Sequence, residues 1–204
     1  MARKRSLDEG PVIAGQILDD AARLFYNKGY DQASIRDLAS LSGMSPSTIY
    51  HHFRNKQEIA FQVIRRFMVN FNEALLPVVR DSSRPVLDRL DDTVRLHLEI
   101  SDQRLPELLR MQSFRDILAD DQEREIARLA RDYHDGVKDL IRQGCARGEL
   151  TVSDATLVTM GILDMLNGVR AWFDHAGKLS LAEVVRAYTD IVRRTVGAPT
   201  SGAE

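Results

Sequence analysis

The chain has 204 residues, of which 44% are hydrophobic and 28% charged, and its formal net charge is −2. This composition is ordinary for a globular protein and excludes a nucleic-acid polycation. No apolar run approaches the ~20 residues that span a bilayer, and the basic N-terminus lacks the apolar stretch of a secretory signal. Cys145 is the single cysteine, so no internal disulfide can form and a reducing, cytoplasmic location is expected.

The hydrophobic pattern predicts an all-α protein, because helical spacing recurs along the chain and alternating Val, Ile and Thr runs are absent. About nine helices are expected. Their approximate ranges are 11–28, 34–42, 45–52, 56–76, 85–100, 106–118, 122–147, 153–175 and 180–196.

The second and third helices carry start and stop signals of unusual clarity. Ser34 can cap the second helix, and Asp37, three residues later, favours its positive end. Gly43 suits the left-handed backbone that ends a helix. Ser45, followed by a proline, is typical of an N-cap and the first residue of a helix. Two short helices joined by a tight turn are therefore expected.

The third helix has little apolar surface, since Ile49 and Phe53 are its main core candidates. At least three of its remaining polar side chains must face outward. These candidates are Ser47, Thr48, Tyr50, His51 and His52. A short helix with a polar outer face packs poorly but is well suited to enter the major groove of DNA.

The fourth helix opens with Asn55 and Glu58, which form a variant of the capping-box pattern. Lys56 lies in its first turn, where a positive charge opposes the helix dipole. A nearby phosphate would remove this conflict, because a helix N-terminus and a lysine both attract it. A solvated surface charge is the alternative.

The last two helices have surfaces that suggest a partner. The helix over 153–175 is apolar almost all round, so two of its sides should be buried. Gly161 and Gly168 would let another helix approach closely. The final helix opens with Ser180 and Glu183, a capping box, and is amphipathic. Together they predict a four-helix interface between two copies; completing the core of one chain is the alternative.

Aromatic and methionine side chains in the central helices can form plain core or line an apolar ligand pocket. The candidate ligand-binding residues are Phe67, Phe71, Met111, Tyr133, Met160 and Asn167. His97 and His134 could add polar contacts. The histidines show no metal-ligand spacing, so no metal site is expected. Known catalytic and phosphate-loop motifs are absent, so neither an enzyme nor a cofactor is expected; a helical enzyme acting on an acyl or lipid substrate is the remote alternative.

The chain resembles TetR-type (tetracycline-repressor-like) transcriptional regulators in the stretch IRDLASLSGMSPSTIYHHFRNKQEI, preceded by AARLFYNKGYDQAS. The resemblance implies a helix-turn-helix DNA-binding domain over 1–56 and a ligand-binding and dimerisation domain over 57–197. Residues 198–204, after the last expected helix, are expected to form a disordered tail. It implies DNA contacts from Ser34, Arg36, Ser45, Ser47, Thr48, Tyr50, His51 and Lys56. Many relatives have a small residue, often glycine, at the position of Ser47, so base preference is expected to differ.

The C-terminal part is similar to a subgroup that controls fatty-acid, aromatic-acid or sterol catabolism, through LNGVRAWF and the following GKLS. Several members of that subgroup sense acyl-coenzyme A thioesters. The resemblance implies a homodimer on palindromic double-stranded DNA, released by a small apolar effector such as an acyl-CoA, with no membrane partner. Arginines 104, 110, 115 and 170 could bind its phosphates or form exposed ion pairs. Constitutive DNA binding without an effector is the alternative.

Overall fold

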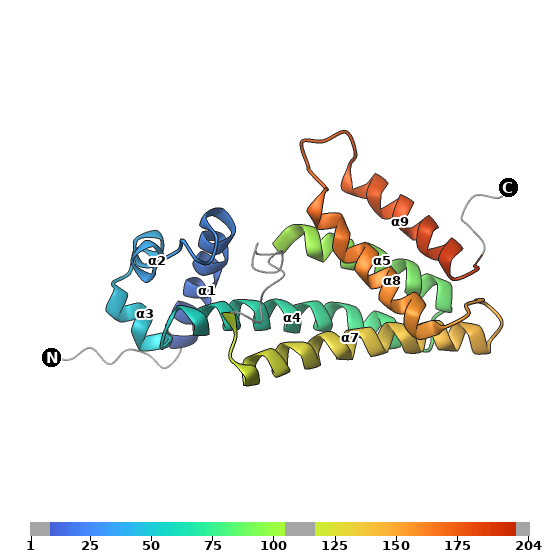
Figure 1. The fold of residues 1–204 in the computed structure, drawn as a ribbon, viewed down its shortest axis with the longest axis horizontal. Coiled ribbons are helices and arrows are strands. Elements are labelled where there is room, and N and C mark those ends of the chain that lie inside the picture. Colours follow the sequence, from blue (N-terminus) through green and yellow to red (C-terminus); the bar gives the residue numbers. More distant parts are fainter. Residues whose placement is uncertain (1–8, 105–116, 199–204) are drawn as a thin grey trace. The chain divides into compact units, whose positions relative to one another are not determined.

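The computed structural model describes residues 9–104 and 117–198, and in these residues it contains helices and no strand (Figure 1). The predicted all-α class is therefore confirmed for the described chain. The helices are α1 (Glu9–Lys28), α2 (Ile35–Ser42), α3 (Pro46–His52), α4 (Lys56–Arg80), α5 (Val86–Arg104), α7 (Asp120–Ala146), α8 (Ala155–Gly168), the 3-10 helix η2 (Val169–Ala171) and α9 (Leu181–Thr195). The helix predicted over 106–118 lies almost wholly outside the described residues, as does the tail after residue 198.

Contacts divide the described chain into two units. The head unit contains residues 9–67 and 117–126, and the body unit contains residues 68–104 and 127–198. Each unit has its own buried side chains, and α4 runs through the boundary between them.

The head unit is a small three-helix core that continues into the first turns of α4. Helix α1 contacts both α2 and α3, and α2 contacts α3. Ile17, Ala21 and Phe25 recur at helical spacing on α1 and are at most 1% exposed. Gly29, with φ 79°, ends α1 in the left-handed region that favours glycine.

Helix α4 continues through Pro77 to Arg80, so the predicted end near residue 76 is wrong. Pro77 is exposed, whereas Leu75 and Val79 are 0% and 1% exposed. The hydrogen bond that proline cannot donate is therefore missing on the solvent side, where water can satisfy the free carbonyl. Burial of Val79 on the opposite side favours continuing the helix.

The C-terminal end of α4 is held by a buried arginine on α5. Arg89 is 0% exposed, and its guanidinium donates to the Val79 carbonyl at 3.2 Å and to Gln143 Oε1 at 3.1 Å. Burial is the main cause that lowers its pKa from the ordinary value. A cation at the carbonyl end of a helix is favourable, so Arg89 stabilises the end of α4 and joins it to α7.

Helices α5, α8 and α9 contact one another in the body unit, and Figure 1 shows them side by side. An ion pair between Arg193 on α9 and Asp91 on α5, with Nε 2.9 Å from Oδ1, adds a polar link to this packing. On α7, Gly144 lies against Leu150, where any side chain would collide.

The start of α8 agrees with the prediction, but its end does not. The N-cap is Asp154, directly after Ser153, and its carboxylate accepts from the Thr156 and Leu157 amides. The α-helix ends at Gly168 and passes through η2, so the expected extension to residue 175 is wrong. Glycine and asparagine are weak helix formers, and the sequence Asn167-Gly168 ends the regular helix. The predicted capping box of α9, formed by residues 180 and 183, is confirmed.

Candidate nucleic-acid interface and effector cluster

The start of α2 is fixed by a complete capping box. Ser34 Oγ accepts from the Asp37 amide at 3.1 Å, and the Asp37 carboxylate accepts from the Ser34 amide at 2.9 Å. Lys28 Nζ donates to the same carboxylate at 2.7 Å. This hydrogen bond, followed by those from Ser34, lowers the pKa of Asp37 to about 2. The cap therefore stays ionised throughout the physiological pH range.

The turn between α2 and α3 follows the predicted pattern. Gly43 adopts φ 63° and its amide lies at the end of α2, while Ser45 Oγ accepts from the Thr48 amide at 3.1 Å. The Thr48 hydroxyl lies 2.9 Å from Ser45 Oγ. These local bonds fix where α3 begins, and its N-terminal polar groups share one small network.

The third helix buries only one side chain, Ile49, which is 0% exposed. Ser47, Tyr50 and His51 are exposed, and Tyr50 is 55% exposed. Thr48 is half-buried beside the N-cap. The structure thus brings the predicted α3 residues together at the surface of the head unit, with their polar groups available to a partner.

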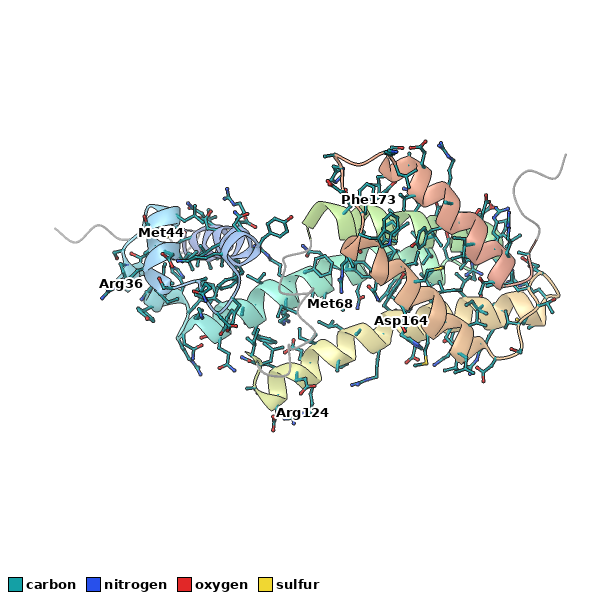
Figure 2. All side chains as sticks on the ribbon, turned by 45° about the horizontal axis from the view of Figure 1, so that its top comes forward. Arg36, Met44, Met68, Arg124, Asp164 and Phe173 are labelled. Carbon is teal, nitrogen blue, oxygen red and sulfur yellow. The ribbon has the colours of Figure 1, made fainter. Side chains whose placement is uncertain are left out.

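Two exposed arginines precede and follow α3 in the sequence and add positive charge to the head unit. Arg36 lies on α2 (Figure 2) and Arg54 follows α3. Neither makes an ion pair with the described residues, whereas Lys28 and Arg66 are paired with Asp37 and Asp19. Arg54 is not among the DNA contacts predicted from the sequence, although a basic residue directly after an outward-facing helix is a signal for one.

Lys56 has a different environment from these arginines. Its ammonium donates to the carbonyls of Tyr30 at 2.8 Å and Ala33 at 3.0 Å, and lies 3.5 Å from that of Asp31. It also lies 4.2 Å from the centre of the Tyr30 ring. The side chain is half-buried, and its charge faces the turn between α1 and α2.

The N-cap of α4 differs in one hydrogen bond from the capping box predicted for Asn55 and Glu58. Asn55 Oδ1 accepts from the Glu58 amide at 2.8 Å, as expected. The Glu58 carboxylate, however, accepts from the Arg54 amide at 2.7 Å and not from that of Asn55. The reciprocal bond is therefore shifted by one residue, and it holds the chain that enters α4.

A buried aromatic and histidine cluster lies in the body unit where α4, α5 and α7 meet. Phe71, His97 and Tyr133 are 5%, 2% and 5% exposed. The Phe71 ring makes edge contacts with the other two rings, each at 5.1 Å between centroids. His97 Nδ1 lies 3.1 Å from the Tyr133 hydroxyl. Two of the predicted ligand-binding residues are thus brought together with His97.

The other nitrogen of His97, Nε2, is buried and makes no hydrogen bond of regular geometry. Burial lowers the pKa of His97 to about 4; a side-chain hydrogen bond with Asn167 opposes this shift, and the charge of Arg170 adds to it. The imidazole is therefore neutral at neutral pH. Since a buried polar atom is costly when its hydrogen bond is poor, the imidazole is held in this apolar cluster by Tyr133 and Asn167.

A third predicted ligand residue, Asn167 on α8, is exposed overall, but its side chain hydrogen-bonds with His97 of this cluster. The others are placed elsewhere: Met160 is 49% exposed on α8, and Phe67 is half-buried in the head unit. Met111 lies outside the described residues, as do the arginines at 110 and 115. No side-chain position is described for residue 104, and Arg170 is half-buried.

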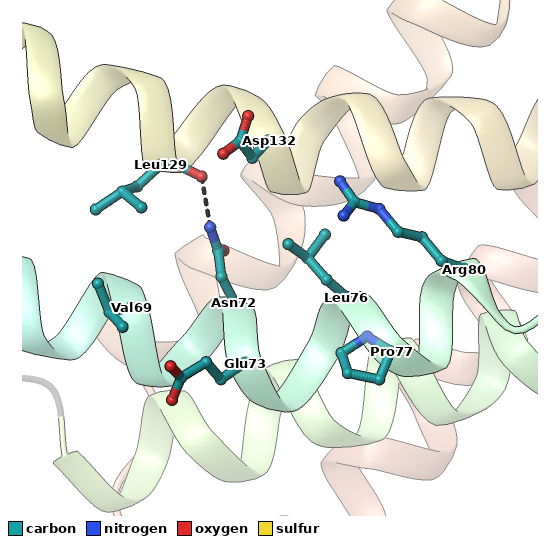
Figure 3. A pocket seen from close by; sticks show the side chains of 8 residues that line it. All are labelled: Val69, Asn72, Glu73, Leu76, Pro77, Arg80, Leu129 and Asp132. Atoms are coloured by element: carbon teal, nitrogen blue, oxygen red, sulfur yellow. Dashed lines mark hydrogen bonds between the residues drawn. The ribbon is translucent and has the colours of Figure 1, made fainter.

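The body unit also contains an open groove of about 540 Å³ between α4 and α7 (Figure 3). Its lining residues are Val69, Asn72, Glu73, Leu76, Pro77, Arg80, Leu129 and Asp132. Asn72 Nδ2 crosses between the helices to donate to the Leu129 carbonyl at 2.9 Å. None of the predicted ligand-binding residues lines this groove.

One face of α8 is exposed although it is partly apolar. The exposed positions are Leu157, Met160, Gly161, Asp164, Asn167 and Gly168. They follow helical spacing and form a single stripe, which we call the α8 stripe; Figure 2 labels its acidic member, Asp164. Leu157 is 67% exposed, and Ile191 on α9 is 43% exposed. Within the described chain, no helix is both long enough and apolar enough to cross a membrane.

Comparison with protein families gives two matches. Residues 17–63 match the model described as bacterial regulatory proteins, tetR family. Residues 83–196 match the tetracyclin repressor-like C-terminal domain. The two matches cover the helix-turn-helix of the head and most of the body.

Curated relatives are transcriptional regulators. The chain is 42% identical over 71 residues to the HTH-type transcriptional repressor Rv1474c of Mycobacterium tuberculosis, a match that covers 32% of this chain and 38% of that protein. It is 28% identical over 180 residues to the probable HTH-type transcriptional regulator ArpR of Pseudomonas putida, which covers 81% of this chain and 83% of that protein.

Solved structures share the fold. The regulator PfmR from Thermus thermophilus is 27% identical, with a TM-score of 0.79 over 87% of this chain and 97% of that one. AibR, solved with isovaleryl coenzyme A and operator DNA, is 22% identical, with a TM-score of 0.79 over 88% of this chain and 97% of that one.

Proposed function

Because this chain belongs to the tetR family of bacterial regulatory proteins, we propose that it is a homodimeric repressor whose binding to a palindromic operator is relieved by a small effector. The observation that supports DNA recognition best is α3. This helix buries one side chain, exposes Ser47, Tyr50 and His51, and begins at Ser45, whose hydroxyl accepts from the Thr48 amide. A helix that served only to stabilise the head unit would be expected to bury more than one side chain.

In this proposal α3 enters the major groove and the start of α2 contacts the backbone. Ser47 and Thr48, near the N-terminus of α3, read base edges, since recognition helices use these positions for bases. Tyr50 and His51 contact sugar or phosphate. Ser34, Arg36 and Ser45, at the starts of α2 and α3, add further contacts that the sequence predicts.

Dimerisation is assigned to the α8 stripe and the exposed residues of α9. Exposed Leu157, Met160 and Ile191 are apolar, and glycine at 161 has open space around its Cα. Burying this surface against a second copy would remove it from water and form a four-helix interface. Two heads could then bind half-sites ~34–36 Å apart on one face of the DNA.

The effector is assigned to the cluster of Phe71, His97 and Tyr133. Its rings offer apolar surface, and His97 Nε2 could donate a hydrogen bond to a ligand in competition with the side chain of Asn167. A thioester carbonyl could accept this bond when the other nitrogen is paired with Tyr133. AibR, a relative in fold, was solved with isovaleryl coenzyme A, so short acyl-CoA thioesters are the first effector class to test.

Regulation follows from a shift in population. An effector releases DNA only if it binds the DNA-incompetent conformation more tightly than the competent one. Phe71 lies on α4, the helix that continues into the head unit. An effector that displaces the Phe71 ring would move α4, and α4 would carry this movement toward the DNA-binding helices.

The test is fluorescence polarisation of the full chain with the DNA upstream of its own gene, with and without a panel of acyl-CoA thioesters. We expect tight, salt-sensitive binding that one thioester releases. Tight binding that no thioester or other metabolite releases would favour a constitutive regulator. Failure to bind this DNA, together with failure to select any binding sequence from random DNA, would contradict the proposal.

Phe71→Leu tests the role of α4, because leucine keeps the position apolar while it removes the ring contacts with His97 and Tyr133. We expect DNA binding without effector to stay within about threefold, and release by the effector to need at least about tenfold more effector. An unchanged effector response would exclude Phe71 as the lever. Circular dichroism melting controls for loss of the fold.

A further inference from the structure

The ammonium of Lys56 has no free donor. It carries three protons, and three backbone carbonyls, those of residues 30, 31 and 33, lie within 3.5 Å of it. The ring of Tyr30 covers another side at 4.2 Å. A phosphate would have to displace these contacts before it could bind, although a lysine at this position favours phosphate on charge alone.

The position of these carbonyls explains why a lysine is stable at the N-terminus of α4. They belong to the turn that follows α1, which ends at Lys28, and each carbonyl oxygen carries partial negative charge. The unfavourable interaction of Lys56 with the dipole of its own helix is therefore offset by hydrogen bonds to this turn.

The same contacts hold the chain that leads into α2. Ala33 is 3% exposed and directly precedes Ser34, the N-cap of α2. A hydrogen bond from Lys56 to the Ala33 carbonyl therefore fixes the peptide that leads into the cap. The first residue of α4 is thus joined to the start of the helix that packs beneath α3.

We propose that Lys56 is a positioning residue for DNA recognition, which ties the start of α2 to the start of α4 and does not hold a phosphate. The cation that contacts phosphate at this end of the head is Arg54, which is exposed and has no ion pair with the described residues. The inference rests on the proposed function for its DNA partner, but the interaction of Lys56 with the turn exists in the free protein.

The test compares Lys56→Met with Arg54→Gln in the full chain, since each variant removes one positive charge from neighbouring positions. The first measurement is amide hydrogen exchange without DNA at Ala33 and Asp37, whose amides bond within the turn and the cap. The second is the slope of operator affinity against salt, which changes by about 0.9 for each phosphate that the protein no longer neutralises.

We expect Lys56→Met to speed exchange at both amides about tenfold or more and to weaken operator binding without changing the salt slope. Arg54→Gln should leave exchange unchanged and reduce the slope by about 1. Lys56→Arg keeps the charge but cannot place three protons of one nitrogen among three carbonyls, so it should also speed exchange. It serves as the second variant if the methionine variant does not fold.

A reduced salt slope with unchanged exchange in Lys56→Met would overturn the proposal and make Lys56 a phosphate-binding residue. Unchanged exchange in both Lys56 variants would also overturn it. The exchange measurement needs no DNA, so failure of the proposed function, seen as absent operator binding by the unmodified chain, is distinguished from failure of this inference.

Discussion

His97 is a titratable side chain enclosed in the body unit, and its environment makes stability depend on pH. It is 2% exposed, and burial lowers its pKa from the ordinary 6.5 to about 4. The folded protein therefore binds fewer protons than the unfolded chain between these two values. Stability from the neutral imidazole is fully present above about pH 6.5 and is lost as the pH falls through about 4.

We expect the free energy of unfolding to fall by up to about 3 kcal/mol from His97 alone as the pH drops from 6.5 to 4. His97→Gln has a similar size and does not titrate, so the difference between the two proteins isolates this contribution. Urea unfolding at half-unit pH steps measures it. Parallel pH profiles for both proteins would show that His97 is not a buried neutral group.

The basic side chain at the start of α4 shows how far residue roles can be read from the sequence. The charge of Lys56 and its unfavourable place at a helix N-terminus are visible in the sequence, and they indicate phosphate or water as its partner. The carbonyls that surround it come from residues 30–33, more than twenty positions earlier. No local pattern indicates such a partner, because it depends on how α1 and α4 pack together.

At the scale of elements, the glycine at 144 shows how closely α7 approaches its neighbours. A Cβ at this position would lie 2.5 Å from Leu150 Cγ and 2.9 Å from Val86 Cγ1. Gly15 on α1 is a matched control, because it also lies inside a helix and a Cβ added there would meet nothing within 4 Å.

Gly144→Ala should destabilise the protein by about 1–3 kcal/mol, since overpacking outweighs the gain in helix propensity. Gly15→Ala has the same gain without the clash and should be neutral or stabilising by up to about 1 kcal/mol. Thermal unfolding followed by circular dichroism compares them. Equal melting temperatures for the two variants would contradict the close approach at Gly144.

Helix boundaries that depend on neighbouring residues were predictable, and those that depend on burial were not. Ser34, Gly43 and Ser45 act through bonds to residues within four positions, and the structure confirms each as a helix start or stop. Pro77 is also a local signal, but the helix continues past it because Val79 is buried beyond. That burial arises from packing that the sequence does not display.

At the scale of the whole molecule, the α8 stripe should control the oligomeric state. Met160→Glu places a charge on an apolar, 49% exposed position of this stripe. If the stripe is the dimer interface, the buried charge would be costly and the variant should be monomeric in light scattering at concentrations where the unmodified chain is a dimer. Operator affinity should fall about a hundredfold or more, because two linked heads bind with avidity.

Val12→Glu is the control, because Val12 is 71% exposed on α1 in the head unit and receives the same charge. It should remain dimeric. A Met160→Glu variant that stays dimeric would place the interface elsewhere on the body, and loss of the dimer in both variants would point to a general effect of charge.

The central claim, that a dimer of this chain reads DNA through α3, is tested most directly by selecting binding sites from a random DNA library. The full chain should enrich an inverted repeat whose half-sites are centred about one helical turn, ~34–36 Å, apart or a multiple of it. Ser47→Ala should change the enriched half-site, whereas Tyr50→Phe should weaken binding and leave the half-site unchanged. Enrichment of no sequence, or of a motif without a repeat that Ser47→Ala does not alter, would contradict the claim.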